Sequence, residues 1–341
     1  MARHRKVGFA VVGLGSIAQS SVLPAFAHSK KARLVAVVSR DRKKAFRLAR
    51  TFKASAVYAQ EEYAACLANP DVDAVYIATP QGEHAGLTVQ AARAGKHVLC
   101  EKPLAATVEQ SAQMVDACQK NHVLLMTAYR KYFEPSTCCV KKLIQRGDLG
   151  RIELIHTAFS ELHVPGKSLE WLLDAKLAGG GPLMDLGIYC VNTSRWLVDE
   201  DPVEVNAEAW KHDAIRFREV EEGISFRMRF SSGLVVLGSS SYGAVMSSFL
   251  YIQGTKGWVS VTPVFDFNEE RRLTGRIRGR RIDRRFKVTD EFAPELDAFA
   301  VAIQSKGEID PDGAQGHRDM IILHSIYESA SKRGPVAVRY E

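Results

Sequence analysis

The sequence of 341 residues has no long hydrophobic run, and no apolar stretch approaches the ~20 residues that a membrane-spanning helix needs. The apolar residues that follow the basic N-terminus begin at Val7 and enter a glycine turn at Gly13, with no small-residue cleavage site. They therefore predict a first strand and not a secretory signal. We expect a protein that stays in the cytoplasm and does not enter a membrane.

Cysteine is scarce and is not arranged for metal binding or for a disulfide framework. The six cysteines include no C-x-x-C pair and have no histidine at zinc spacing. Free thiols in a reducing compartment fit this usage, and no metal site is expected. The cysteines are Cys66, Cys100, Cys118, Cys138, Cys139 and Cys190.

Excess charge of one sign is absent from most of the chain. The net charge is +7, but nine basic residues and one acidic residue give residues 271–287 a charge of +8, so the other residues together carry −1. Apolar residues alternate with the basic ones, which predicts a hairpin with a charged face. The segment has one aromatic residue and no known nucleic-acid module. A solvated edge strand, protected by charge from edge-to-edge pairing, is therefore favoured over a nucleic-acid partner.

The overall composition is that of a globular protein, with 46% hydrophobic and 25% charged residues. The length favours two domains. In residues 1–127, short Val/Ile/Ala-rich runs alternate with amphipathic stretches, which predicts a parallel sheet covered by helices, a doubly wound Rossmann domain of α/β class. We expect strands at residues 7–12, 33–38, 56–58, 74–78, 97–100 and 123–126, and helices at 16–28, 41–52, 83–94 and 108–120.

The pattern changes in residues 128–341. Strand-like stretches follow one another at hairpin spacing, which predicts an α+β domain with an open, mainly antiparallel sheet. We expect strands at residues 203–210, 223–230, 234–241, 249–253 and 258–261, and helices at 135–146, 183–198, 291–304 and 314–331.

The first predicted strand ends in a G-x-G-x-x-A turn. Gly13 permits the tight turn, Gly15 lets the backbone approach a pyrophosphate, and Ala18 permits close packing of a helix whose N–H groups face the anion. Ser16 and Ile17 complete the turn. Glycine turns between strands and helices are common. In a repeating strand–helix series, however, this one predicts a dinucleotide site.

No acidic residue ends the second predicted strand, where a carboxylate would accept from a ribose 2′-OH and repel a 2′-phosphate. Ser39 can donate a hydrogen bond to a phosphate, and Arg40 and Lys44 can offset its charge. We therefore predict NADP(H), with NAD(H) as the alternative. In a second interpretation, the basic residues are the solvated first turn of a helix that Asp41 caps.

Two further motifs carry chemistry. Cys100-Glu101-Lys102-Pro103 follows the fifth predicted strand, and residues 179–189 read Gly-Gly-Gly-Pro-Leu-Met-Asp-Leu-Gly-Ile-Tyr. Lys102 lies just beyond a carboxyl end of the predicted sheet, where open α/β folds bind ligands, so its ammonium can polarise a substrate oxygen. Asp185 and Tyr189 are four residues apart, so on a helix they share one face.

These three side chains suit hydride transfer between a secondary alcohol and its carbonyl. The charge of Lys102 would favour the phenolate of Tyr189, which we assign as the general acid/base. Asp185 would hydrogen-bond the substrate hydroxyl. Each assignment has a structural alternative: Tyr189 as a core tyrosine, and Asp185 as a charge favoured near a helix N-terminus.

The glycine turn, Glu-Lys-Pro, and Gly-Gly-Gly leading to Asp-x-Gly-x-Tyr together resemble the Gfo/Idh/MocA family of nicotinamide-dependent oxidoreductases. The Tyr129-Arg130 pair and residues 178–189 are most similar to its glucose–fructose oxidoreductase and sugar or dihydrodiol dehydrogenase branch. Many relatives have His where this chain has Tyr189. The resemblance implies a sugar or polyol substrate and a homodimer or homotetramer formed through the C-terminal sheet.

The resemblance also implies roles for residues around the cofactor. Glu101 would contact the nicotinamide ribose, and Thr79 and Pro80 would line the nicotinamide. The peptide bond between Lys102 and Pro103 would be cis.

Four more residues have open interpretations. Tyr129 and Arg130 are implied to lie near the nicotinamide or the substrate, with a buried aromatic beside a surface cation as the alternative. Trp171 could stack on a sugar or belong to the core. His84 is expected to be a packing residue and not a catalytic one.

Two other functions remain as rivals. A catalytically silent NADP-binding regulator would have the same fold, but it would have no need for Lys102, Asp185 and Tyr189 together. A trans-dihydrodiol dehydrogenase would use the same chemistry on a different alcohol. Nucleic-acid binding through residues 271–287 is the least favoured function.

Overall fold

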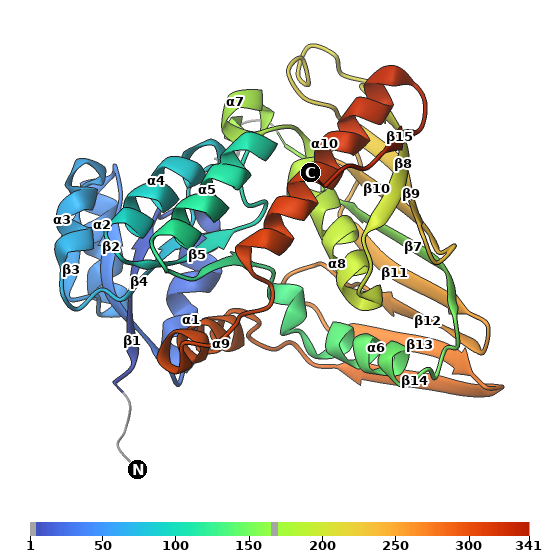
Figure 1. Ribbon diagram of the computed structural model, residues 1–341, viewed down its shortest axis with the longest axis horizontal. Coiled ribbons are helices and arrows are strands. Elements are labelled where there is room, and N and C mark those ends of the chain that lie inside the picture. Colours follow the sequence, from blue (N-terminus) through green and yellow to red (C-terminus); the bar gives the residue numbers. More distant parts are fainter. Residues whose placement is uncertain (1–4, 165–169, 341) are drawn as a thin grey trace. The chain divides into compact units, whose positions relative to one another are not determined.

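The structure, a computed structural model, describes residues 5–164 and 170–340, which form two compact units. The first unit contains the chain up to Arg130 together with Asp290–His317. The second contains Lys131–Thr289 and the residues from Arg318 onward. Figure 1 colours the chain by residue number. Among the described residues, none of the helices has the length and apolar character needed to span a bilayer.

A parallel sheet is the core of the first unit. Its strands are β1 Val7–Val12, β2 Ala32–Val38, β3 Ala56–Tyr58, β4 Ala74–Ile77, β5 His97–Glu101 and β6 Leu125–Ala128. They lie in the order β3-β2-β1-β4-β5-β6, with every neighbouring pair parallel. The central strand β1 is buried at every position, as its apolar sequence Val-Gly-Phe-Ala-Val-Val requires in a sheet covered on both faces.

Helices connect these strands. They are η1 Ala18–Val22, α1 Leu23–His28, α2 Arg42–Phe52, η2 Gln60–Glu62, α3 Tyr63–Ala68, α4 Gln81–Arg93 and α5 Val108–Lys120. Asp41 caps α2 by accepting a hydrogen bond from the Lys44 N–H at 2.9 Å. Because α4 packs beside α5, the two cover the β4–β5 side of the sheet together (Figure 1).

The last part of the first unit comes from far along the chain. Helix α9, Phe292–Ser305, packs against β1 through Phe299, whose ring lies 6.2 Å from that of Phe9. Asp297 of α9 also accepts hydrogen bonds from the N–H groups of Lys30 and Lys31, at 2.9 and 2.8 Å. The sequence places residues 128–341 in one C-terminal domain, whereas the structure assigns Asp290–His317 to the first unit and ends its first segment at Arg130. A helical pattern does not reveal which core it covers.

The second unit is built on a mixed sheet. Its strands are β7 Ile152–Ser160, β8 Pro202–Trp210, β9 Gly223–Phe230, β10 Val235–Ser241, β11 Ser247–Gly254, β12 Gly257–Thr262, β13 Arg271–Ile277, β14 Arg280–Phe286 and β15 Val336–Ala337. The order is β14-β13-β12-β11-β7-β10-β9-β8-β15. Only the pair β7–β10 is parallel among these described strands. The sequence did not predict β7, because its partners β10 and β11 come only after residue 234 and so give no hairpin pattern beside it.

The helices of the second unit are η3 Arg130–Tyr132, which begins at the end of the first unit, α6 Pro135–Gln145, η4 Glu170–Leu173, α7 Ala175–Ala178, η5 Leu183–Gly187, α8 Ile188–Val198 and α10 Gly313–Lys332, whose first residues belong to the first unit. Helices α6 and α8 cover one face of the sheet (Figure 1). Helix α8 packs on β7 and β10, and α6 packs on β13. Side chains of the other face stay partly exposed and include two aromatic contacts, His156 with Phe249 and Tyr251 with Trp258.

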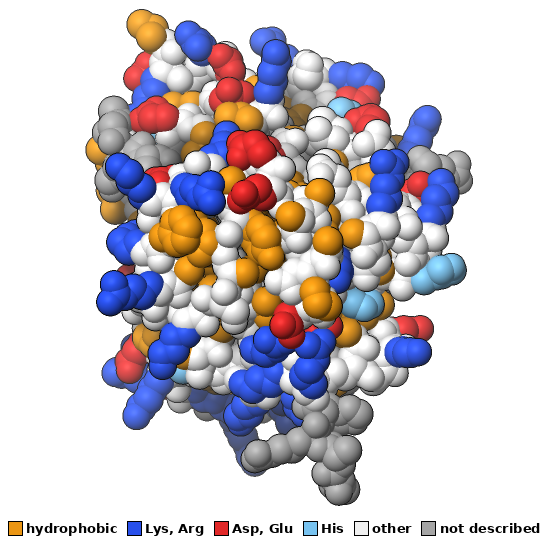
Figure 2. Space-filling view, turned by 90° about the vertical axis from the view of Figure 1, so that its left-hand side faces the viewer, with side chains coloured by type: hydrophobic (Ala, Val, Ile, Leu, Met, Phe, Trp, Pro, Cys, Tyr) orange, Lys and Arg blue, Asp and Glu red, His pale blue; other side chains and the backbone are white. Residues whose placement is uncertain are grey.

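The predicted charged hairpin is confirmed at the β14 end of this sheet, where β13 and β14 pair. Arg272 and Asp283 form an exposed ion pair across it, at 2.6 Å. Arg271 is the exception, because it is 2% exposed and its guanidinium lies 3.7 Å from the buried carboxylate of Glu134. Elsewhere both signs mix: the face drawn in Figure 2 carries acidic, basic and apolar side chains among one another.

Candidate active site

The glycine turn after β1 has the geometry of an anion cradle. Gly13 has a φ of +88°, and a Cβ at this position would lie 2.6 Å from the carbonyl oxygen of Ala78. Gly15 differs, because a Cβ there would meet no atom of the described residues within 4 Å, its chain neighbours apart. Ala18 is fully buried where the helix begins, whereas Ser16 is exposed. The open space beside the Gly15 backbone fits a pyrophosphate.

This turn lies at the switch point of the sheet. Strand β1 has β2 on one side and β4 on the other, and ligands of open α/β sheets bind at such a point, beyond the carboxyl ends of the strands. The predicted cofactor residues follow those ends in turn. Gly13, Gly15, Ser16, Ile17 and Ala18 follow β1, Ser39, Arg40 and Lys44 follow β2, Thr79 and Pro80 follow β4, Lys102 follows Glu101 at the end of β5, and Arg130 follows β6.

The residues after β2 carry an ion pair that the sequence did not predict. Arg40 is 65% exposed in its side chain and pairs with Glu83 of α4, with 2.5 Å between Nη2 and Oε1. The Ser39 hydroxyl accepts a hydrogen bond from the Asp41 N–H at 3.1 Å, so its own hydrogen can be donated. Lys44 is half-buried in the first turn of α2. A 2′-phosphate bound here would share Arg40 with Glu83.

His84 ties two of these loops together. It is 1% exposed, and its ring nitrogens lie 2.9 Å from the Thr79 carbonyl oxygen and 3.1 Å from that of Leu104. Burial lowers the pKa of His84. The residue therefore holds the loop after β4 against the loop after β5, which agrees with its expected packing role. Pro80 precedes α4 directly.

Glu101 and Lys102 form the end of β5 and the start of its loop. Glu101 is buried, and its carboxylate accepts hydrogen bonds from the Tyr76 hydroxyl at 2.8 Å and from the Lys102 N–H at 3.3 Å. Burial raises the pKa of Glu101, and the Lys102 charge opposes that shift. Lys102 is half-buried. The Lys102–Pro103 peptide bond is cis, so this expectation is confirmed.

A buried ion pair follows β6. Arg130 is 2% exposed, so it is not a surface cation, and its Nη1 lies 2.5 Å from the buried Glu291 carboxylate. Tyr129 is buried beside it. Glu295, one turn further along α9, is fully buried, and both of its carboxylate oxygens lack a hydrogen-bond partner among the described residues. Burial raises the pKa of Glu295 well above its usual value.

In the second unit, Asp185 and Tyr189 lie on successive turns, but not on one regular α-helix. The predicted helix 183–198 begins as the π-helical turn η5, which carries Asp185, and continues as α8, which carries Tyr189. Asp185 is half-exposed and accepts a hydrogen bond from the Tyr242 hydroxyl at 3.1 Å. Tyr189 is 7% exposed, and its ring lies 5.7 Å from Phe159 and 5.5 Å from Phe265.

The glycine-rich turn before η5 is fixed by an acidic residue that the sequence did not single out. The buried carboxylate of Glu221 accepts hydrogen bonds from the N–H groups of Gly181 and Leu183, at 3.1 and 3.0 Å, and from the Tyr327 hydroxyl at 2.8 Å. Burial raises the pKa of Glu221, and these hydrogen bonds oppose the shift. The N–H of Leu183, one of those that a helix start leaves unbonded, is thereby satisfied.

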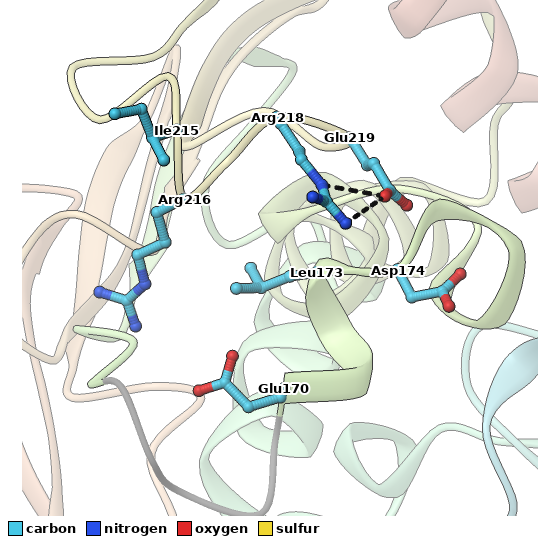
Figure 3. Close-up of a pocket in the computed structure, with 7 residues that line it drawn as sticks. All are labelled: Glu170, Leu173, Asp174, Ile215, Arg216, Arg218 and Glu219. Carbon is cyan, nitrogen blue, oxygen red and sulfur yellow. Dashed lines mark hydrogen bonds and ion pairs between the residues drawn. The ribbon is translucent and has the colours of Figure 1, made fainter.

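A hollow of about 290 Å³ lies elsewhere in the second unit. Its walls come from η4, from the residue before α7 and from the loop between β8 and β9, and Figure 3 draws the ion pair between Arg218 and Glu219 in it. Trp171 is half-buried on η4 but does not line this hollow, and neither do Asp185 and Tyr189. The lining residues are Glu170, Leu173, Asp174, Ile215, Arg216, Arg218 and Glu219.

Two family profiles match consecutive parts of the chain. Residues 7–129 match the oxidoreductase family with an NAD-binding Rossmann fold, Gfo/Idh/MocA, and residues 139–260 match a Gfo/Idh/MocA C-terminal domain. The chain belongs to the Gfo/Idh/MocA family. The predicted fold class and the oxidoreductase class are thereby confirmed.

Individual family members are similar over most of their length. A D-xylose 1-dehydrogenase [NADP(+)] of Haloarcula marismortui is 32% identical, covering 98% of this chain and 94% of that protein. A levoglucosan dehydrogenase of Pseudarthrobacter phenanthrenivorans is 28% identical, covering 79% of this chain and 81% of that protein. The crystal structure of an aldose–aldose oxidoreductase from Caulobacter crescentus, complexed with glycerol, is 34% identical, with a TM-score of 0.93 over 98% of this chain and 100% of that one.

Proposed function

We propose that the protein is an NADP(H)-dependent aldose oxidoreductase, which oxidises the C1 hydroxyl of an aldose in its cyclic form to the lactone, or reverses that reaction. The observation that carries this proposal is the similarity to a D-xylose 1-dehydrogenase [NADP(+)] over 98% of the chain. The aldose–aldose oxidoreductase similarity supports the same substrate class.

NADP(H) is favoured over NAD(H) by the residues after β2. Ser39 and Arg40 stand where a carboxylate would exclude a 2′-phosphate, and Lys44 adds a second cation nearby. The open space at Gly15 accommodates the pyrophosphate. We expect titration to give a smaller Kd for NADP+ than for NAD+. An equal or smaller Kd for NAD+ would falsify this cofactor assignment.

We assign the chemistry to Lys102, Asp185 and Tyr189. A bound nicotinamide would supply the acceptor for the hydride that leaves the sugar carbon. Tyr189 takes the hydroxyl proton as general base, and the ammonium of Lys102 stabilises negative charge on the same oxygen. Asp185 accepts a hydrogen bond from the substrate and orients it.

Supporting positions are proposed for the other predicted residues. Glu101 contacts the nicotinamide ribose, and Thr79 and Pro80 line the nicotinamide. Tyr129 and Arg130 lie by the nicotinamide or the sugar, and Trp171 stacks on the sugar.

The experiment is a substrate screen with the purified protein. Mass spectrometry first identifies any bound dinucleotide, and D-xylose, other aldoses, ketoses, polyols and a trans-dihydrodiol are then tested for reduction of NADP+. We expect aldoses to give the highest kcat/KM. Preference for the dihydrodiol would favour the alternative dehydrogenase, and dinucleotide binding without any turnover would favour the silent regulator.

Self-association is proposed through the uncovered face of the nine-stranded sheet. Two aromatic contacts lie partly exposed there, Tyr251 with Trp258 and His156 with Phe249. A dimer or tetramer is expected by light scattering, and Tyr251→Glu should shift it toward the monomer. The cytoplasmic location and the absence of a nucleic-acid partner stay predictions.

A further inference from the structure

We propose that Tyr242 is a positioning residue that holds the carboxylate of Asp185 in its working orientation. This inference rests on the proposed function of Asp185. Tyr242 follows β10 directly, is 2% exposed, and donates its phenol hydrogen to Oδ2 of Asp185 at 3.1 Å. Because a hydrogen bond to one carboxylate oxygen fixes the plane of the group, it also fixes the direction in which the other oxygen accepts.

Tyr242 is itself held from several sides. Its N–H donates to the Glu222 carbonyl oxygen and its carbonyl oxygen accepts from the His163 N–H, both at 2.9 Å. The His163 ring lies 5.5 Å from the Tyr242 ring, and Nδ1 of His163 accepts a hydrogen bond from Arg216, one of the residues drawn in Figure 3. The phenol therefore approaches Asp185 from a fixed direction.

The turn that carries Asp185 is fixed against the same strand. A Cβ on Gly187 would lie 2.9 Å from the Ser240 Oγ of β10, so η5 lies directly on that strand. Glu221 holds the start of η5 through Gly181 and Leu183. The backbone of Asp185 and the ring of Tyr242 are thus both fixed against β10, and the 3.1 Å bond between their side chains restrains the torsion of the carboxylate.

Tyr242 acts as a donor and not as an acid/base. Burial raises its pKa well above the usual value, and the charge of Asp185 acts in the same direction. The phenol stays protonated, which is the form that can donate to a carboxylate.

A double-mutant cycle with kcat/KM for the aldose tests this role. Tyr242→Phe keeps the ring and its packing on His163 and removes only the hydroxyl, so the fold is retained. Because hydrogen bonds to charged groups are the stronger ones, we expect Tyr242→Phe to lower kcat/KM about 10-fold in the wild-type background. In an Asp185→Asn background we expect Tyr242→Phe to lower kcat/KM less than about 2-fold, since Tyr242 acts through Asp185.

The matched control is Tyr63→Phe, which removes another buried phenol, bonded to the Leu87 carbonyl oxygen at 3.2 Å. It should leave kcat/KM within about 2-fold of wild type, because that bond belongs to the scaffold alone. Equal losses from Tyr242→Phe in both backgrounds, or no loss in either, would overturn the proposal.

A readout without turnover separates this proposal from the proposed function. In crystal structures of the apo protein, the Asp185 carboxylate should have a different torsion in Tyr242→Phe than in wild type. An unchanged torsion overturns the positioning role even if aldoses are oxidised. A changed torsion in a protein that oxidises no sugar supports the Tyr242–Asp185 contact and refutes the proposed function.

Discussion

Two glycines of one turn allow folding and cofactor binding to be perturbed separately. Gly13 has a φ of +88°, whereas a Cβ on Gly15 would have no atom of the described chain within 4 Å, apart from its sequence neighbours. Alanine at position 13 therefore strains the fold. Alanine at position 15 only fills the space that we assign to the pyrophosphate.

The cost of Gly13→Ala follows from two contributions. A left-handed backbone costs a non-glycine residue ~1–2 kcal/mol. The added Cβ would lie 2.6 Å from the Ala78 oxygen and 2.7 Å from its carbonyl carbon, and overpacking of this kind costs ~1–3 kcal/mol. We expect a loss of ~2–5 kcal/mol in the free energy of unfolding, measured by urea denaturation.

Gly15→Ala should leave the free energy of unfolding within ~0.5 kcal/mol of wild type. Its methyl group would displace an anion from the backbone N–H groups, and a hydrogen bond to a charged group contributes ~1.5–3 kcal/mol. The Kd for NADP+, measured by calorimetry, should rise at least ~10-fold. Wild-type affinity in Gly15→Ala would refute the assignment of this turn to the pyrophosphate.

Two further substitutions test the first unit. Glu83→Gln removes the carboxylate that competes with a 2′-phosphate for Arg40. Fluorescence titration should therefore show about 2- to 5-fold tighter NADP+ binding. An equal gain in affinity for NAD+ would contradict the role of Arg40 in recognising a 2′-phosphate. Glu295→Gln tests how the buried Glu295 carboxyl affects stability. Burial raises the pKa of Glu295 in the folded protein above the usual 4.5 of the unfolded chain. As the pH rises from the unfolded-state pKa toward the folded-state pKa, the wild type therefore loses stability, on the order of 1 kcal/mol per pH unit. Denaturant unfolding from pH 5 to 8 should show that the free energy of unfolding of the variant rises relative to that of wild type as the pH increases. The same pH dependence in both proteins would contradict this.

The sequence was most informative where one segment determines its own structure. Residues 7–12, 56–58, 108–120 and 223–230 have the predicted bounds, because short parallel strands, a capped helix and an alternating strand each have a local signature. The glycine turn was likewise available from a short motif, and the cis bond after Lys102 was implied by the family resemblance.

What the sequence could not provide depends on distant partners. Glu83 has no local signal for contact with Arg40, which lies 43 positions earlier. The sequence predicted Glu291 only as the start of a helix, yet it pairs with Arg130, which lies 161 positions earlier. Tyr242 and Glu221 lie between strands and belong to no motif. Their contacts with Asp185 and with the turn at Gly181 are therefore seen only in the folded structure.

The central claim is our proposal that Lys102 and Tyr189 both take part in the oxidation of the sugar hydroxyl. Reduction of NADP+ by the aldose, measured in Lys102→Met, Tyr189→Phe and the double variant, tests it most directly. The account predicts that each variant still binds NADP+ and that each single variant loses turnover. It also predicts that the double variant is little slower than the slower of the two single variants. Turnover at the wild-type rate in either single variant, or losses that multiply in the double variant, would contradict it.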